Sequence, residues 1–312
     1  IEPYTYGDYE IIPHHFDADK NAAEIAQFMA RYITKPYILG KNIVGVELNF
    51  NKEFYVAEKP ESVEDILQEI KALEEEQQTV INSVVTEGLN PDVSKQDSGL
   101  DWLGMIPEHW EVKRLKEYFS MGKGLSITKD DLQEKGASVI SYGQIHAKNN
   151  SGVTIEQDFI RYVDESYCLT NPQAIVPKGG FIFADTSEDV LGSGNCIYQD
   201  RDEVILGGYH TVILYPKESN DNKYLAYLFQ TDKWRKQIRS NVYGIKVMSI
   251  TQAILGKCFI VLPPYSEQKA IVEYLDTKCT TIDTKIGNIA KRIEAYKRLK
   301  KSLINEVVSG KR

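Results

Sequence analysis

The sequence predicts an α+β protein in which one globular, β-rich domain is flanked by two long antiparallel helices that form a coiled coil. A small N-terminal α/β segment precedes them. The first observation behind this prediction is a repeat: Val80-Ile-Asn-Ser-Val-Val-Thr86 returns as Leu303-Ile-Asn-Glu-Val-Val-Ser309, each time shortly before a glycine. The second is periodicity, because helix-period stretches end in the two copies and short β-type runs fill the block between them.

Residues 1–60 are predicted to form the small mixed segment. Residues 8–13 and 42–50 have strand-like composition, and the apolar residues between Lys20 and Ile33 have helical spacing. His14 and His15 stand near two aspartates, but adjacent histidines on an extended segment point in opposite directions. A solvated loop is therefore favoured over a metal site.

Residues 61–89 are predicted to form the first long spacer helix. From Val63 to Val84, apolar residues step by three and four positions, with Gln77 as one polar member, which is a heptad pattern. Ser62 is the expected N-cap, and Gly88 the expected end. Residues 90–99 form a polar linker that is rich in turn-forming residues.

The domain at 100–265 is predicted to contain a substantial sheet and one clear helix. The helix runs from Asn222 to Arg239, with apolar residues on one side. The β-type runs are separated by turns and lie at 137–142, 180–184, 204–208, 211–215 and 259–262.

Residues 266–312 are predicted to form the second long spacer helix, a rod on the order of 65 Å. An apolar seam of this length is not stable alone in water and needs a partner helix, for which 61–89 is the natural candidate. The residues expected to pair the two helices are Ile66, Ile70, Leu73, Val80, Val84, Leu275, Ile282, Ile286, Ile289, Ile293, Tyr296 and Leu303.

The charge is uneven along the chain, although the net value is −8. Residues 1–99 hold 8 basic and 19 acidic residues, whereas residues 266–312 hold 11 and 6. Local patches decide whether phosphate can approach, so only the acidic first third is a poor candidate for DNA binding. The four cysteines are far apart and are expected to be reduced, in a cytosolic protein. No apolar run approaches the length of a membrane span.

No pattern in the sequence predicts catalysis or a bound metal. Leu262-Pro-Pro-Tyr265 is similar to a motif of amino-group methyltransferases, but leucine has no acceptor for the target amino group. The Gly192-Ser-Gly194 and Gly122-Lys-Gly124 pairs lack the rest of a phosphate-binding loop. We therefore expect no catalytic residue and no cofactor in this chain.

Three polar stretches have the side chains that read base edges and phosphates. Residues 141–150 combine an aromatic ring, an amide that can bind adenine, a histidine and a lysine, and 183–189 and 208–211 are similar in kind. Residues 233–239 place four basic residues on a short helix, followed by Lys246. Polar surface loops and a solvated helix face are the alternative interpretations.

Two longer motifs resemble those of specificity subunits in type I restriction–modification enzymes. Asp97-Ser-Gly-Leu-Asp-Trp-Leu-Gly-Met-Ile-Pro-Glu-His-Trp-Glu-Val-Lys-Arg-Leu115 resembles the opening of a target recognition domain. Leu262-Pro-Pro-Tyr-Ser-Glu-Gln-Lys-Ala-Ile-Val-Glu-Tyr-Leu-Asp276 is similar to the passage from such a domain into its spacer helix. The repeat and Glu87-Gly-Leu-Asn-Pro-Asp92 fit the same family, so that the resemblance covers residues 77–312.

The chain departs from the family pattern in having one recognition domain where a full specificity subunit has two. Residues 44–55, Val-Gly-Val-Glu-Leu-Asn-Phe-Asn-Lys-Glu-Phe-Tyr, resemble the C-terminal tail of the family's adenine methyltransferase subunit. Because the sequence starts at Ile1, we expect the end of a fused polypeptide, with a modification domain followed by a half-specificity module.

The resemblance implies sequence-specific recognition of double-stranded DNA, without chemistry in this chain. It implies an associated methyltransferase that uses S-adenosylmethionine on adenine N6, possible pairing with a restriction subunit, and a homodimer or a second half-specificity module to complete a two-part target. The alternative is a coiled-coil assembly protein whose globular domain binds another protein. The residues expected to contact DNA are Gln144, His146, Lys148, Thr186, Ser187, Tyr209, His210, Arg235, Arg239, Tyr243, Lys246 and Ser249.

Overall fold

A computed structural model describes residues 12–34, 36, 62–218, 220–242, 244 and 247–308 of the chain. The chain divides into two compact units, residues 1–60 and 61–312. In the first unit, α1 (Ala18–Tyr32) begins after Asp17, whose carboxylate accepts hydrogen bonds from the backbone N–H groups of Asp19 and Lys20. The strands predicted at 8–13 and 42–50 lie wholly or largely outside the described residues.

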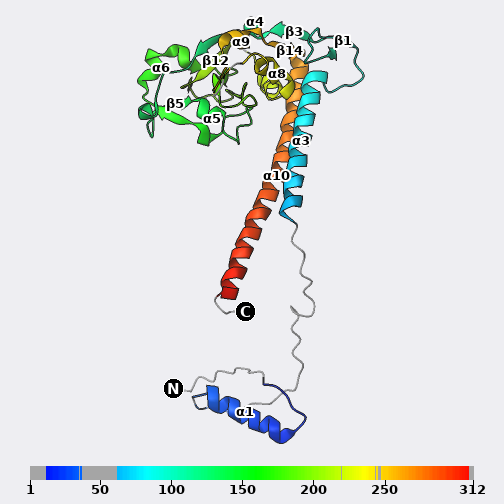
Figure 1. Ribbon diagram of the computed structural model, residues 1–312, viewed down its shortest axis with the longest axis vertical. Coiled ribbons are helices and arrows are strands. Elements are labelled where there is room, and N and C mark those ends of the chain that lie inside the picture. Colours follow the sequence, from blue (N-terminus) through cyan, green and yellow to red (C-terminus); the bar gives the residue numbers. More distant parts are fainter. Residues whose placement is uncertain are drawn as a thin grey trace. The chain divides into compact units, whose positions relative to one another are not determined.

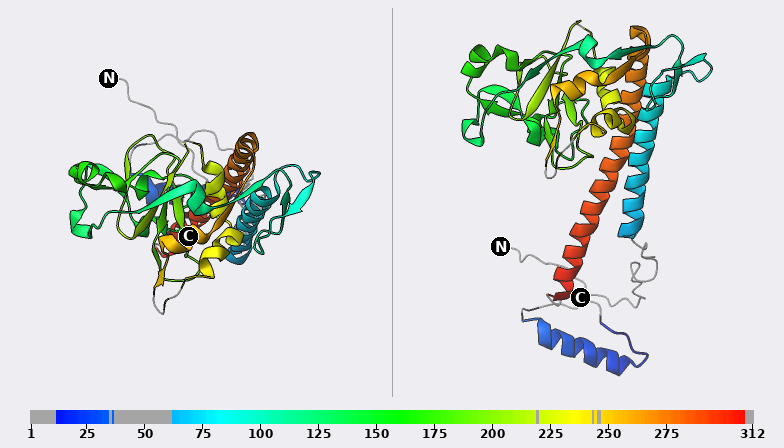
Figure 2. Two further views of the ribbon diagram at one scale, coloured as in Figure 1. Left: turned by 90° about the horizontal axis from the view of Figure 1, so that it is seen from above. Right: turned by 45° about the horizontal axis from the view of Figure 1, so that its top comes forward.

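Two long helices of the second unit, α3 (Val63–Glu87) and α10 (Tyr265–Val308), lie side by side and run antiparallel (Figures 1 and 2). The hydroxyl of Ser62 caps α3 by accepting from the backbone N–H of Asp65 at 3.0 Å. The helix ends at Gly88, whose φ of 81° suits a residue without a Cβ. No helix among the described residues is long and apolar enough to cross a membrane.

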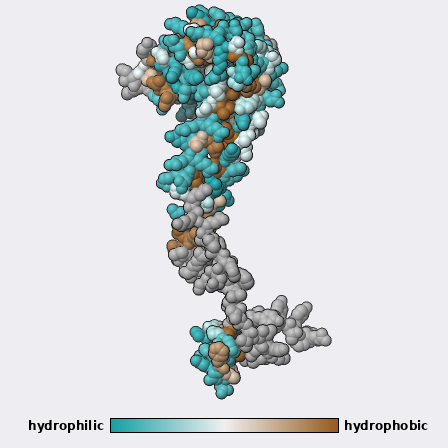
Figure 3. Space-filling model, turned by 90° about the vertical axis from the view of Figure 1, so that its right-hand side faces the viewer, coloured by the Kyte–Doolittle hydropathy of each residue, from teal (hydrophilic) through white to brown (hydrophobic). Residues whose placement is uncertain are grey.

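The register of the helix pair is set by two polar contacts far apart along it. Gln77 donates to the Asp283 carboxylate at 2.9 Å, and Arg292 contacts Glu69 at 2.7 Å. Figure 3 shows apolar side chains along the helix pair, between hydrophilic ones. Among the residues expected to pair the helices, these are buried: Ile66, Val84, Leu275, Ile282 and Ile289. Half-buried are Ile70, Leu73, Val80, Ile286 and Ile293.

The remaining two expected pairing residues, Tyr296 and Leu303, are 37% and 39% exposed. α10 is 44 residues long and α3 only 25. In the register given above, the first turn of α3 lies near Tyr296, and about three turns of α10 beyond it have no described α3 residue beside them. Leu303 is therefore exposed because no described residue of α3 reaches it, whereas Tyr296 lies where the described part of the helix pair ends.

Two four-stranded sheets form the globular domain, which we call the head. The first sheet has the order β10-β8-β12-β4 and is antiparallel, whereas the second, β6-β5-β11-β7, contains one parallel pair, β11 with β5. The strands of the first are β10 (Cys196–Tyr198), β8 (Phe181–Ala184), β12 (Thr211–Pro216) and β4 (Phe119–Lys123). Those of the second are β6 (Arg161–Val163), β5 (Ala137–Ile140), β11 (Ile205–Gly207) and β7 (Ile175–Val176).

The first sheet is buried on both faces, which explains why β8 is apolar at every position. Phe181 and Phe183 pack in a core with the helices, whereas Ile182 and Ala184 pack in a second core with the other sheet. Successive side chains of a strand point to opposite faces, so a strand between two cores has no polar face. The head therefore has three layers: helices, the first sheet and the second sheet.

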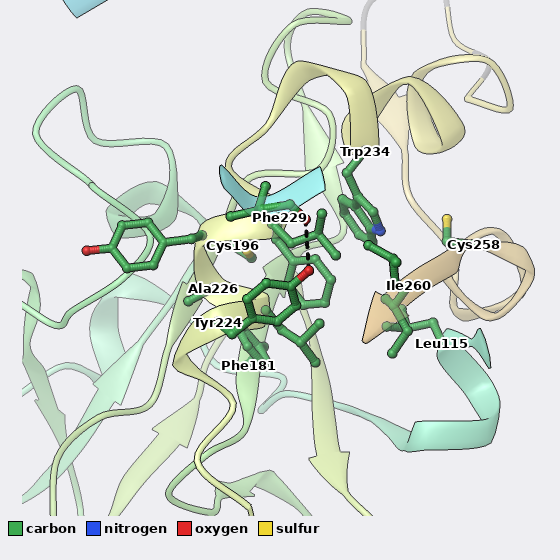
Figure 4. Packing of buried hydrophobic residues seen from close by; sticks show 14 of the residues in the cluster. Leu115, Phe181, Cys196, Tyr224, Ala226, Phe229, Trp234, Cys258 and Ile260 are labelled. Carbon is green, nitrogen blue, oxygen red and sulfur yellow. Dashed lines mark hydrogen bonds between the residues drawn. The ribbon is translucent and has the colours of Figure 1, made fainter. Parts of the chain in front are cut away.

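The helix predicted from Asn222 to Arg239 is two helices, and the prediction of one was wrong. They are α7 (Lys223–Phe229) and α8 (Asp232–Arg239). The break is at Thr231, whose buried hydroxyl donates to the Leu228 carbonyl at 2.7 Å and accepts from the Trp234 backbone N–H at 3.2 Å. A threonine that satisfies both helix ends in this way ends one helix and caps the next. Figure 4 shows Phe229 and Trp234, from either side of the break, packed in one core.

A two-stranded ribbon joins the two ends of the head. β3 (Glu111–Arg114) pairs antiparallel with β14 (Phe259–Leu262), and the backbone N–H of Leu115 donates to the Cys258 carbonyl at 2.8 Å. Next to it, the polar linker predicted at 90–99 contains a strand, β1 (Lys95–Asp97), which pairs with β2 (Met105–Pro107). Trp234 donates to the Phe259 carbonyl at 2.9 Å, which holds α8 on the ribbon.

The remaining short elements connect these strands and complete the described chain. They are α4 (Leu115–Tyr118), η1 (Lys129–Asp131), α5 (Tyr142–Ile145), η2 (Gln157–Phe159), α6 (Ser166–Thr170), η3 (Pro172–Ala174), β9 (Thr186–Ser187), β13 (Met248–Ser249) and α9 (Gln252–Lys257).

Tyr224 joins the head to α3, which leads to a test of stability. This fully buried side chain donates its hydroxyl to the Val85 carbonyl at 2.8 Å (Figure 4). Tyr224→Phe leaves a buried carbonyl without that partner, so we expect the free energy of unfolding to fall by about 1–3 kcal/mol in urea denaturation. Tyr296→Phe makes the same change at an exposed position and is expected to shift it by less than about 0.5 kcal/mol. Equal effects of the two variants would contradict this account.

Candidate nucleic-acid interface

Four segments of the head meet where strands of the two sheets end. The backbone N–H of Tyr142, in α5, donates to the Tyr209 carbonyl at 3.1 Å, and that of Asp185 donates to the His210 carbonyl at 3.1 Å. The N–H of Ile250, directly after β13, donates to the Asp185 carbonyl at 2.7 Å. These bonds bring together stretches that lie more than one hundred residues apart in the sequence.

Three rings form an aromatic group at this junction. The Tyr142 ring centre lies 5.5 Å from that of His210 and 6.2 Å from that of Tyr209, and the last two are 3.9 Å apart. Both tyrosines are exposed. His210 has a left-handed backbone, with φ of 54°, and its Nδ1 is hydrogen-bonded to the Asp185 carboxylate at 2.9 Å. The histidine is thus held at a fixed angle beside the two tyrosines.

Polar side chains surround the aromatic group. Gln144 uses its side-chain oxygen to accept from the backbone N–H of Ser141 at 3.0 Å, and within the described residues its amide nitrogen donates to no acceptor. Thr186 pairs with Ser249 across β9 and β13, and Ser249 is exposed. We call this set the Tyr142 cluster; it consists of Tyr142, Gln144, Thr186, Tyr209, His210 and Ser249.

His146 supports the cluster and does not face outward. Its Nε2 donates to the Thr186 carbonyl at 2.8 Å, and its Nδ1 accepts from the Asn195 amide at 3.1 Å. Both ring nitrogens are therefore hydrogen-bonded inside the head. A direct contact between these nitrogens and a base, as the sequence analysis expected, would require both bonds to break.

Arg235 is likewise committed to internal bonds. It donates to the Phe229 carbonyl at 2.8 Å, to the side-chain oxygen of Asn195 at 2.8 Å and to Gln230. Burial lowers the pKa of its guanidinium, because the charged form loses hydration. Through Asn195, this arginine is connected to His146 and so to the cluster.

Arg239 joins α8 to the turn that follows β9. It donates to the Leu191 carbonyl at 2.6 Å and to the Asp232 carboxylate at 2.7 Å, and its side chain is 14% exposed. Its Nε is buried and has no hydrogen-bond partner among the described residues. A phosphate contact by Arg239, as expected from the sequence, would have to form beside these internal bonds or replace them.

The other expected contact residues are divided. Lys148 is exposed and lies after α5, whereas Ser187 is buried, with its hydroxyl directed at the turn after β9. Tyr243 and Lys246 lie outside the described residues. Three residues of this region were not among the expected contact residues, namely Tyr142, Asp185 and Asn195, although the first two lie within the polar stretches 141–150 and 183–189. Their roles depend on contacts across the sheets, which a local pattern does not contain.

The charge around the cluster is mixed. The basic residue Lys148 is outnumbered in these segments by the acidic residues Asp185, Glu188 and Asp189, so the described part of the site is not a basic cleft. Hydrogen-bonding groups and rings predominate, and these suit base edges more than phosphates.

Two features of the described residues concern metal binding and thiol chemistry. No group of three or more His, Cys, Asp or Glu side chains there is placed to hold a metal ion. Burial raises the pKa of the Cys196 and Cys258 thiols to about 12, which keeps them protonated at neutral pH.

Comparison with known protein families gives a match over the head and most of α10. Residues 107–295 match the family model described as Type I restriction modification DNA specificity domain, which is more than half of the chain. The chain belongs to this family. The matched range includes every described residue of the Tyr142 cluster and the strands that position it.

Individual members of the specificity-domain family are distant relatives. The type I restriction enzyme MjaVIII specificity subunit of Methanocaldococcus jannaschii is 25% identical over 79% of this chain and 56% of its own length. The putative MjaX specificity subunit of the same organism is 27% identical over 66% and 47%. The chain thus spans about half the length of the curated relatives it matches. A crystal structure of the HsdS subunit from Thermoanaerobacter tengcongensis aligns with a TM-score of 0.47 and 20% identity, over 78% of this chain and 52% of that one.

In this specificity domain, Arg235→Lys should lower stability. Lysine cannot reproduce the fork of donors that binds Phe229, Asn195 and Gln230 together. We expect the free energy of unfolding to fall by about 1.5–3 kcal/mol, measured by urea denaturation. Lys233→Ala, at an exposed position of the same helix, serves as control, with a change within about 0.5 kcal/mol. Unchanged stability of Arg235→Lys would show that the internal bonds are dispensable.

Proposed function

We propose that this chain recognises a specific sequence in double-stranded DNA and that the Tyr142 cluster makes the base contacts. The observation that carries the proposal is the convergence of exposed rings, an amide and hydroxyls from four segments at one place in a domain of this family. Sequence is read by hydrogen bonds and apolar contacts to base edges, and this is the inventory such contacts need.

The residues of the cluster have different tasks in this proposal. Gln144 donates from its amide nitrogen, because its oxygen is held by the backbone N–H of Ser141 at 3.0 Å. Tyr142 and Tyr209 offer hydroxyls and ring edges. His210, held by Asp185 at 2.9 Å, offers its second ring nitrogen, Nε2.

His146, Arg235 and Arg239 act as positioning residues. They connect α8, the turn after β9 and α5 by hydrogen bonds of 2.6–3.1 Å. Contacts to phosphate are then expected from exposed lysines, such as Lys148 and Lys233, and from Lys246, which lies outside the described residues.

We infer that α3 and α10 form a coiled-coil spacer with a heptad seam. The support is the run of buried and half-buried apolar residues at steps of three and four and the antiparallel register. At about 1.5 Å per residue, α10 alone is on the order of 65 Å long. Such a rod fixes the distance between two recognition domains.

The second recognition domain is supplied by another copy of this chain or by a second half-specificity module. The exposed apolar side chains at the end of α10, Leu299, Leu303 and Ile304, are the surface that pairs the two. A homodimer with two-fold symmetry then reads a two-part palindromic target.

Chemistry on the DNA belongs to partners in this scheme. A methyltransferase domain or subunit binds S-adenosylmethionine and methylates adenine N6 in the DNA target that this chain recognises. A restriction subunit is directed by recognition of the same target. This assignment rests on family membership. We expect the complex in the cytoplasm, with the DNA.

Selection of duplexes from a random library, followed by methylome sequencing of cells that express the parent protein, tests this function. We expect one enriched motif, and the same motif methylated. An unenriched library, together with capture of a protein partner that resists nuclease treatment, would favour the alternative of a coiled-coil assembly protein.

Gln144→Glu separates base reading from folding. The variant keeps the acceptor for the Ser141 N–H and removes the amide donors, so the local fold is retained. We expect discrimination at one base pair to fall by about tenfold, since a good base contact is worth about 1–3 kcal/mol. Gln133→Glu makes the same charge change at an exposed residue on an edge of the second sheet and should leave discrimination unaltered. If Gln144→Glu and Gln133→Glu lower discrimination equally in competition binding, the cause is general repulsion of DNA by the added charge and not a lost base contact.

Replacing both Leu299 and Leu303 by Asp tests the pairing surface. Each buried leucine contributes about 1.5–3 kcal/mol, so we expect the sedimentation coefficient to fall from that of a dimer to that of a monomer at micromolar concentration. Lys300→Asp introduces the same side chain at an exposed polar position and should leave the dimer intact. A parent chain that sediments as a monomer would remove the homodimer from the proposal.

A further inference from the structure

The turn between β9 and β10 exposes two apolar side chains beside the Tyr142 cluster. Leu191 is 71% exposed and Val190 is 44% exposed. Exposed leucines on mobile loops are common and need no explanation, but this one stands on a turn that is fixed from several sides. We propose that Val190 and Leu191 form a wedge that enters a base step of the target DNA and partly unstacks it.

The turn is closed by its own hydrogen bonds. The Asp189 carboxylate accepts from the backbone N–H of Gly192 at 2.6 Å, and its carbonyl accepts from the Ser193 hydroxyl at 3.2 Å. The backbone N–H of Ser193 donates to the Val190 carbonyl at 3.2 Å, and that of Asn195 to the Gly192 carbonyl at 3.0 Å. Both apolar residues therefore lie within a tight, internally bonded loop.

An arginine holds the tip of the turn from behind. Arg239 donates to the Leu191 carbonyl at 2.6 Å, and Asp232 fixes the same guanidinium at 2.7 Å. Because the Leu191 carbonyl is directed at α8, its backbone is anchored to the head while its side chain stays in solvent. A charged group mostly withdrawn from water to hold one carbonyl is a costly arrangement that a freely moving loop would not need.

The turn also lies tightly against its neighbours, which glycine permits. Gly194 has φ of 100°, and a Cβ there would approach Ile238 at 3.1 Å and Arg235 at 3.4 Å. A Cβ on Gly192 would lie 2.6 Å from the Ser187 hydroxyl and 3.4 Å from His146. The short distance from Gly192 to His146 shows that the turn and the Tyr142 cluster are adjacent, because the His146 and Tyr142 ring centres are 6.4 Å apart.

Rigidity and position together favour a wedge over a flexible contact. Unstacking a base step costs a few kcal/mol, and proteins that do it insert apolar side chains such as leucine. A side chain on an anchored backbone loses little conformational freedom on insertion, so more of its contact energy is available to offset that cost. The neighbouring cluster would then read bases in the distorted duplex.

The inference rests on the proposed DNA recognition, and the test separates the two. The full chain is bound to a series of selected target duplexes, in each of which one base is replaced by 2-aminopurine. The fluorescence of 2-aminopurine rises when the base is unstacked. For the parent protein we expect a rise in fluorescence at one base step. For Leu191→Ala we expect that rise to be lost and the affinity for the target to be weaker by about tenfold, which corresponds to 1.4 kcal/mol. Leu169→Ala, at a leucine of α6 that is 85% exposed, should behave like the parent.

Other outcomes overturn the wedge in distinguishable ways. A parent that binds its target without any fluorescence rise excludes unstacking but leaves DNA recognition standing. A second outcome is that Leu191→Ala weakens binding although neither protein raises the fluorescence. If replacing one thymine of the target by uracil then makes the affinities of parent and variant equal, Leu191 contacts the methyl group of that thymine and no wedge exists. A parent without sequence preference rejects the proposed function and the wedge together.

Discussion

The first sheet of the head, β10-β8-β12-β4, supports the structure on both of its faces. One face carries the aromatic core in which Phe181, Phe183 and Phe229 pack with α7 and α8, and the other carries the aliphatic core beneath the second sheet. The helix pair is positioned through the first core, because Val85 of α3 and Leu275 of α10 belong to it. The Tyr142 cluster is positioned through the second, at the ends of β5, β11 and β12. One sheet that is buried on both faces therefore connects the helix pair to the Tyr142 cluster.

Elements whose chemistry is local were readable in the sequence. Ser62 and Gly88 mark the ends of α3 because a cap hydroxyl and a left-handed glycine act on their immediate neighbours. The apolar runs at 180–184 and 211–215 correspond to β8 and β12, since a strand buried on both faces has no polar alternation. The break at Thr231 could not be predicted, because Thr231 separates α7 from α8 by hydrogen bonds to both helices, within a stretch whose apolar residues keep helical spacing.

The sequence did not show which side chains of the candidate site point inward, for a physical reason. Composition identifies a basic helix but not the direction in which its arginines point. In α8, Arg235 and Arg239 turn inward to bind carbonyls and amides, while Lys233 and Lys236 remain in solvent. His146 resembled a base-contacting residue for the same reason, and both its nitrogens are occupied by partners about 40 and 49 residues away. Such partners become apparent only once the sheets bring distant loops together.

The pairing of β3 with β14 places the entry and exit of the head next to each other. The segment between Leu115 and Cys258, which holds every residue of the Tyr142 cluster, is inserted between these two antiparallel strands. A different insert bounded by the same two strands would leave the polar contacts between α3 and α10 unchanged, provided that it keeps the core residues that pack on these helices, such as Tyr224. With the proposed DNA recognition in the head, this arrangement allows the DNA preference to change by exchange of the segment between β3 and β14, while the helix pair that carries the head is kept.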